Sequence, residues 1–140
     1  MSSFPEIKKA TLILKSSETN ENKSEIQDDE IVTDIVVQSF TDRHVVIITQ
    51  LGKLGTIINA ESDLSSNSAN IIDGKKTYTM NTLLGKRNDP LFDVYARQII
   101  ERIAITSDKP LLLTIALVES GRGVKYMEAI LNKIMEIKTW

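Results

Sequence analysis

The sequence predicts an α+β fold: an antiparallel β-meander sheet with two packed C-terminal helices, in the order ββββ(β)αβα. In the first part of the chain, β-branched residues cluster in short runs between polar connections. Two later stretches carry apolar residues at helical spacing, and a run that is apolar on both faces lies between them. The chain has 140 residues, so we expect a single domain over residues 1–140.

Five strands are expected before the first helix, at residues 10–15, 31–40, 44–49, 56–60 and 77–84. A short polar turn joins the second and third, which predicts a hairpin. The connection that follows contains Gly52 and Gly55, and a tight turn between antiparallel strands requires the positive φ that glycine adopts without strain. The fourth strand then completes a three-stranded antiparallel meander.

Helix signals begin at Asp89-Pro90. Asp89 can accept hydrogen bonds from exposed amides, and proline suits the first helical position because no amide is needed there. The first helix is expected over residues 91–105, and its apolar face consists of Phe92, Ala96, Ile99, Ile100 and Ile103. Residues 111–118 predict a central strand buried on both sides. The last helix, over residues 124–138, presents Val124, Met127, Ile130, Leu131, Ile134 and Ile137 on one side.

Composition excludes several classes of function. The chain has no cysteine and one histidine, so thiol catalysis, disulfides and a histidine metal cage are excluded. The net charge of -2 gives no reason to expect nucleic acid. No apolar run can span a bilayer and no secretory signal is visible, so we expect no membrane contact and a cytoplasmic protein, with the nucleus as a further location.

Two polar segments interrupt the predicted elements. Residues 16–30 form an acidic segment, which is typical of a solvated loop. Residues 61–76 are rich in serine and asparagine and carry Asp63 and Asp73. Loops of this length are usually functional or disordered, so this one is either an idle surface loop or a contact for a partner.

The sequence does not contain the parts of an active site. Gly52-Lys53 and Gly85-Lys86 lack the remaining residues of a phosphate loop, and Gly121-x-Gly123 lacks the third glycine of a dinucleotide site. His44 has only Asp42 nearby as a candidate catalytic partner, so a surface or hydrogen-bonded histidine is the favoured interpretation. We therefore expect no enzyme, no metal and no cofactor.

Residues 49–56, with the sequence TQLGKLGT, resemble the proteasome assembly chaperone 3 family. Leu83-Leu84-Gly85, the helix start Asp89-Pro90-Leu91 and the terminal Trp140 agree with the same family. The resemblance covers residues 30–140 and is weakest in the acidic segment.

The resemblance implies a non-enzymatic chaperone that acts as a dimer, with a second copy or with the sister protein, chaperone 4. Members of the family help α-type subunits to assemble into the ring of the 20S proteasome and leave before the mature particle forms. The alternative is a small dimeric α+β scaffold module of a vesicle-trafficking complex, which has no reason to carry the TQLGKLGT segment.

The candidate partner-binding residues are Gln50, Lys53, Asp63, Asp73 and Trp140. Backbone geometry does not explain Gln50 and Lys53. We expect the 62–76 loop to lie beyond the turn that holds them, so that all these charges share one end of the sheet. Trp140 either packs on the edge of the core or contacts the dimer partner.

Overall fold

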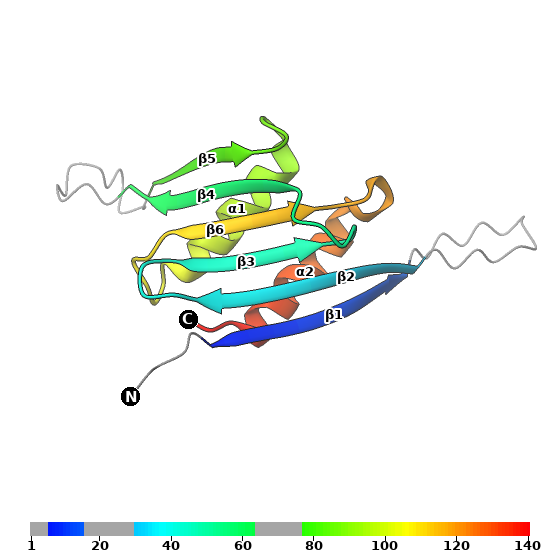
Figure 1. Cartoon of the computed structure of the whole chain (residues 1–140), viewed down its shortest axis with the longest axis horizontal. Coiled ribbons are helices and arrows are strands. Elements are labelled where there is room, and N and C mark those ends of the chain that lie inside the picture. Colours follow the sequence, from blue (N-terminus) through cyan, green and yellow to red (C-terminus); the bar gives the residue numbers. More distant parts are fainter. Residues whose placement is uncertain (1–5, 16–29, 64–76) are drawn as a thin grey trace, which may run out of the picture.

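A computed structural model of the chain describes residues 6–15, 30–63 and 77–140. Within them, six strands form one mixed sheet and two α-helices cover one of its faces (Figure 1). The strands are β1 (Ile7–Lys15), β2 (Glu30–Ser39), β3 (His44–Thr49), β4 (Thr56–Ser62), β5 (Tyr78–Leu84) and β6 (Leu111–Ala116). The helices are α1 (Pro90–Ile103) and α2 (Val124–Ile137), and the 3₁₀ turn η2 (Glu119–Gly121) precedes α2. The predicted α+β class is confirmed.

The strand order in the sheet is β1-β2-β3-β6-β4-β5. β2 and β3 form the predicted antiparallel hairpin. The meander needs one correction, because β6 lies between β3 and β4, parallel to β3 and antiparallel to β4. The apolar character of β6 on both faces places it in the centre of the sheet. Residues 50–55 are therefore not a hairpin turn, since they pass across the end of β6.

The core lies between the sheet and the helices. α1 packs against β4, β5 and β6, whereas α2 packs against β1 and β2. Alternate residues of each inner strand face this layer, as the period of two requires. The fully buried large side chains are Ile35, Ile48, Ile58, Tyr95, Ile99, Ile100, Ile103, Leu111, Leu113, Ile115, Ile130 and Ile134.

Both helices begin and end within a few residues of the predicted positions. Asp89 is the N-cap of α1 and its carboxylate accepts the amide of Leu91 at 3.1 Å. The predicted apolar face of α1 is buried, together with Tyr95, which the pattern missed. One prediction for α2 is wrong: Val124 is 65% exposed, and Tyr126 is buried instead. With 100° of rotation per residue, Val124 and Tyr126 lie on opposite sides of the apolar stripe of α2. Only the side that carries Tyr126 faces the core.

Candidate interaction surfaces

The TQLGKLGT segment, Leu83-Leu84-Gly85 and Asp89-Pro90-Leu91 are far apart in the sequence but meet at one end of the sheet, which we call the Asp89 end. Here β3, β6 and β5 finish and β4 begins, on the right of Figure 1. The connection at residues 50–55, the turn before α1 and the turn before α2 lie side by side, as the contacts below show. This convergence follows from strand direction, because neighbouring elements that end at the same edge bring their connections together.

The 50–55 connection is built on Thr49. The hydroxyl oxygen of Thr49 accepts the amides of Leu51 and Lys53, each at 3.2 Å. Gly52 and Gly55 both have positive φ, at 67° and 68°. A side chain at Gly55 would also stand 2.5 Å from the carbonyl oxygen of Ile115, so the connection can lie against β6 only with glycine there.

Gln50 anchors this connection to the turn before α2. Its Nε2 donates to the hydroxyl of Thr33 at 3.2 Å and to the carbonyl oxygen of Gly121 at 3.5 Å. Its Oε1 accepts the amide of Val118 at 3.0 Å. A Cβ at Gly121 would overlap the amide group of Gln50. Gln50 therefore has a structural role that the sequence did not reveal.

Gly85 and Thr56 connect the same end to the start of α1. The amide of Lys86 donates to the Thr56 hydroxyl at 3.1 Å. Gly85 has a φ of 94°, and a Cβ there would lie 2.7 Å from the Thr56 oxygen. The Leu-Leu-Gly segment thus lets the chain turn closely over β4 before α1 begins.

Asp89 is the centre of this end and is only 2% exposed. Arg122 donates from Nη2 to its two oxygens at 2.8 and 2.9 Å, and Lys86 Nζ lies 3.6 Å from Oδ2. The guanidinium of Arg122 also lies 5.2 Å from the ring centre of Phe92, a cation–π distance. One carboxylate therefore caps α1 and ties it to the start of α2.

The charges of this pair stabilise each other. Burial pushes the pKa of Asp89 upward, but the hydrogen bond and charge of Arg122 and the amides of Leu91 and Phe92 outweigh it, so the pKa lies below 3.8. The Asp89 hydrogen bond likewise raises the pKa of Arg122. The pair is ionised at neutral pH.

The opposite end of the sheet, which we call the His44 end, contains a buried histidine. His44 is 3% exposed, and its ring nitrogens contact two serine hydroxyls, Nδ1 at 2.7 Å from Ser39 and Nε2 at 3.0 Å from Ser107. Burial and the charge of Lys109 lower the pKa of His44 below 6.5. The imidazole is neutral at neutral pH, which agrees with the hydrogen-bonded histidine expected from the sequence.

Trp140 lies at the same end. Its ring packs edge-on against His44 with the centroids 5.5 Å apart, and it borders the core as a partly buried side chain. The hydroxyl of the neighbouring Thr139 is hydrogen-bonded to the hydroxyl of Ser39. The C-terminal residues are thus held to the start of β3, which is the core-edge position that the sequence offered as one alternative.

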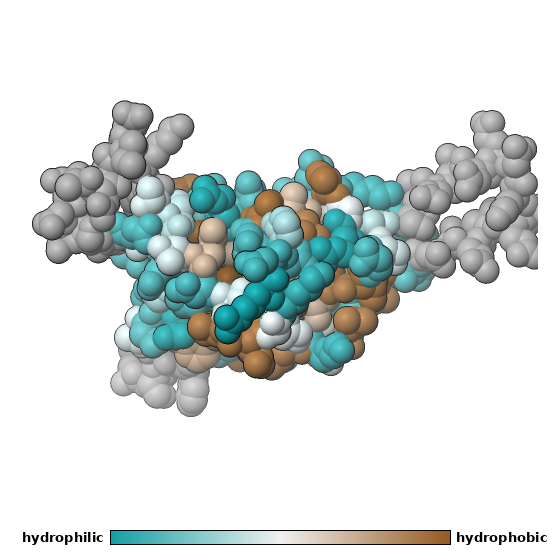
Figure 2. Space-filling view, turned by 90° about the horizontal axis from the view of Figure 1, so that it is seen from above, coloured by the Kyte–Doolittle hydropathy of each residue, from teal (hydrophilic) through white to brown (hydrophobic). Residues whose placement is uncertain are grey.

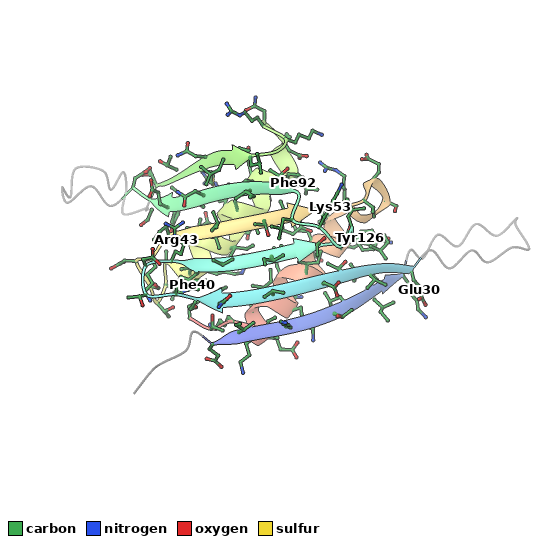
Figure 3. All side chains as sticks on the ribbon, viewed as in Figure 1. Glu30, Phe40, Arg43, Lys53, Phe92 and Tyr126 are labelled. Atoms are coloured by element: carbon green, nitrogen blue, oxygen red, sulfur yellow. The ribbon has the colours of Figure 1, made fainter. Side chains whose placement is uncertain are left out.

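The structure separates the predicted partner-binding residues. Gln50 and Lys53 lie at the Asp89 end. Figure 3 shows Lys53 at this end of the sheet and Phe40 and Arg43 at the other end. Asp63 follows β4, so it lies at the other end, and its carboxylate accepts the hydroxyl of Thr79. The expectation that these charges share one end is therefore wrong, because a strand of seven residues separates its two flanking connections by about 20 Å. Asp73 and nearly all of the 62–76 loop lie outside the described residues.

The face of the sheet opposite the helices is mainly apolar at its centre, where the buried Thr114 is the polar residue between Ile47 and Ile57. Its half-buried side chains are Val36, Val45, Ile47, Ile57 and Leu112, and at the margin Ile13 and Val32 are 59% and 48% exposed. The pairing register places these central side chains in adjacent rows across β2, β3, β6 and β4. Hydrophobic atoms gather along the lower margin of Figure 2, on the side of this face. We call it the uncovered face, since no described element packs on it.

Arg122 and the uncovered face were missed from the sequence. Arg122 lies in the Gly121-x-Gly123 turn that leads into α2, and nothing in that short pattern indicates a partner for its side chain. The signal that could have found the uncovered face was present in β2 and β3, where consecutive β-branched residues make both strand faces apolar rather than one.

A family model for proteasome assembly chaperone 3 matches residues 46–137, which include the 50–55 connection and both helices. The chain belongs to this family. A relative from Bos taurus named proteasome assembly chaperone 3 is 28% identical over 110 residues, covering 79% of this chain and 85% of its own length. The Homo sapiens protein of that name is 27% identical over 104 residues, covering 73% and 81%.

A solved structure shares the fold. It is described as a novel chaperone complex for yeast 20S proteasome assembly, and one of its chains matches with a TM-score of 0.58 and 14% identity. The match covers 89% of this chain and 96% of that one. The family assignment favours a chaperone over the vesicle-trafficking scaffold.

Within residues 6–15, 30–63 and 77–140, no three acidic or histidine side chains gather in a way that would hold a metal ion. Neither described helix has the length and apolar character needed to cross a bilayer.

Proposed function

We propose that this chain is a non-enzymatic chaperone that acts as a dimer to promote formation of the 20S proteasome α-subunit ring, and that leaves before the mature particle forms. Its dimer partner is a second copy or the sister chaperone 4, and it works in the cytoplasm. The family assignment supports a role in proteasome assembly. The uncovered face is the observation that supports the dimer.

Soluble monomers rarely expose a large continuous apolar patch. Both helices of this chain lie on one face of the sheet, and branched apolar side chains from four adjacent strands gather at the centre of the other, around Thr114. A second sheet packed on this face would cover these side chains at the spacing of about 10 Å that sheet sandwiches adopt. The dimer interface of the proposal is therefore the uncovered face.

The ends of the sheet are left for proteasome subunits. At the Asp89 end, Lys53 is exposed beside Leu51 and Leu54, which are 48% and 54% exposed. Gln50 holds the 50–55 connection in place beneath these side chains through its hydrogen bonds to Thr33 and Val118. A small surface with charged side chains suits a chaperone that must release its client, because charged contacts speed encounter and weaken with salt.

The dimer is tested by placing a charge on the uncovered face. Ile47→Lys puts an ammonium group at the centre of the apolar rows, and burying it in an interface would cost several kcal/mol. We expect sedimentation velocity to show a dimer for the natural chain, alone or with the sister chaperone, and a monomer for the variant. Val94→Lys is the matched control, because Val94 is a 40% exposed apolar residue on α1, in the helix layer.

The outcomes separate the parts of the proposal. A natural chain that stays monomeric with both partners would contradict the dimer. A dimer that survives Ile47→Lys but not Val94→Lys would move the interface to the helices. Native gels with α-type subunits then test the function itself, and we expect ring intermediates to accumulate with the natural chain and not with the monomeric variant.

A further inference from the structure

The two edges of the sheet differ in how they are protected from another strand. An edge strand presents unpaired backbone groups, and natural proteins protect such edges with charged residues, above all lysine. β1 carries Lys8, Lys9 and Lys15, in keeping with that rule. β5 has the sequence YTMNTLL, without a charge or a proline. Among the described residues, no strand pairs with the outer side of β5.

One backbone hydrogen bond shows which residues of β5 face outward. The amide of Asp63 donates to the carbonyl oxygen of Thr77 at 2.8 Å, so this pair is a hydrogen-bonded pair of the antiparallel ladder. Such pairs alternate with pairs whose backbone groups point away from each other. In the register of β4 and β5, the backbone groups of Tyr78, Met80 and Thr82 therefore point to the open edge.

The length of this edge limits what it can bind. The register shifts at Ile57/Ile58, opposite Leu83, and this irregularity ends the regular ladder after Thr82. The remaining stretch of five residues is about 17 Å long. One strand of that length buries far less than the roughly 800 Å² per partner of a stable interface. The edge therefore suits a short extended segment that exchanges readily.

The charges around β5 define the segment that fits. Past its C-terminal end stand Lys86, whose side chain is 69% exposed, and the exposed Arg87. Beside its N-terminal end lie Glu61 and Asp63. Antiparallel pairing is the more stable arrangement, and it brings the beginning of an added strand to the basic end. The complementary segment is acidic before its β-prone run.

A second copy of this chain does not fit that description. In the sequence, Lys75 and Lys76 precede β5, so the β5 of a second copy is basic where the added strand should be acidic. Like charges placed opposite each other destabilise a strand pair. The β2 of a second copy does follow acidic residues, but β2 is already paired on both sides, with β1 and β3. The occupant therefore belongs to another protein.

We propose that the outer edge of β5 binds an extended segment of a partner protein, which adds as an antiparallel strand along Tyr78–Thr82 and carries acidic residues ahead of its β-prone run. Backbone hydrogen bonds to Tyr78, Met80 and Thr82 provide the affinity, as in other cases of strand addition. Lys86 and Arg87 select the orientation. This site is separate from the uncovered face, so a dimer formed there leaves the edge accessible.

Peptide selection on the full chain tests the proposal. A displayed library of random twelve-residue peptides is selected for binding to the natural protein, and we expect enrichment of β-branched runs preceded by aspartate or glutamate. Hydrogen exchange with a selected peptide should slow at the amides of Met80 and Thr82. Failure to enrich such peptides, or protection at another surface, would overturn the proposal.

Two variants make the test specific. Thr82→Pro removes an amide that faces the open edge, so β4 pairing survives while selected peptides should bind about tenfold more weakly or worse. Thr82→Val keeps the amide and is the matched control, with binding unchanged. Arg87→Glu should shift the enrichment of selected peptides away from acidic residues. If a thermal melt shows that Thr82→Pro does not fold, the peptides selected by Arg87→Glu still test the proposal. Equal binding to Thr82→Pro and Thr82→Val, or unchanged selection by Arg87→Glu, contradicts the proposal.

Discussion

The two ends of the sheet bury polar side chains by different means. At the Asp89 end the buried group is a carboxylate, ionised and held by a guanidinium, an ammonium group and the first amides of α1. At the His44 end it is a neutral imidazole between two serine hydroxyls, with Trp140 packed against it. Both arrangements satisfy a buried polar group, yet only the first depends on charge.

The comparison shows what each end contributes to the fold. The Asp89 end joins the starts of both helices through one ion pair, and the residues of the family resemblance other than Trp140 surround it. At the His44 end, a hydrogen bond between Thr139 and Ser39 and the edge-on contact of Trp140 with His44 hold the C-terminal residues to the sheet without an ion pair. We therefore expect substitutions at the Asp89 end to cost more stability, and the two ends to respond to acid in different pH ranges.

The largest effect is expected for Phe92→Ala. Phe92 is 6% exposed and lies under Arg122, so truncation leaves a cavity and removes the cation–π contact, at a cost of about 3–5 kcal/mol. Phe40→Ala is the matched control near the His44 end, because Phe40 is 37% exposed (Figure 3). Urea unfolding measures both variants. Equal losses would show that the two ends do not differ in packing.

A smaller but still large loss is expected for Arg122→Ala. Removing Arg122 leaves the buried Asp89 carboxylate with only the exposed Lys86 and the first amides of α1 as partners, which costs up to about 3 kcal/mol. Asp89→Asn keeps a capping side chain and removes the charge, so the double variant should be less destabilised than the two single losses predict. The exposed pair of Arg97 with Glu101 at 3.9 Å serves as the control, and Arg97→Ala should cost below about 0.5 kcal/mol. Strict additivity would refute the coupling of Asp89 to Arg122.

The sequence predicted the elements better than their arrangement. The cap at Asp89 and the strand at His44 depend on local chemistry, and both were placed correctly. The insertion of β6 between β3 and β4 was not predicted, because hydrophobic patterns report how deeply a strand is buried and not which strand lies beside it.

The candidate site was predicted less well for the same reason. Gln50 looked available for a partner because its acceptors, Thr33 and Gly121, are distant in the sequence. Arg122 finds Asp89 only when the turns before the two helices meet in space. Lys53 and Asp63 are likewise separated because they lie before and after β4, at its two ends. Sequence patterns do not show the direction in which a strand runs through the sheet.

The smallest effect is expected for His44→Gln, and its pH dependence distinguishes the two ends most directly. At neutral pH the variant loses the hydrogen bonds of a neutral ring, about 1 kcal/mol each, and the edge-on contact with Trp140. Because the pKa of His44 is lowered in the folded state, the unfolded chain takes up the proton first. Stability is then full above pH 6.5 and is lost as the pH falls from there through the folded pKa. His44→Gln should abolish this loss.

Asp89→Asn is the corresponding test at the Asp89 end, where the loss of stability is expected at lower pH. The pKa of Asp89 is also lowered by folding, but from 3.8, so its contribution is complete above that pH and disappears only in stronger acid. The free energy of unfolding, measured by urea titration from neutral to acidic pH, should thus flatten below 6.5 in the histidine variant and below 3.8 in the asparagine variant. A histidine variant that keeps the natural decline below pH 6.5 would mean that His44 does not stay neutral in the fold, and the contrast between a charged and a neutral end would fail.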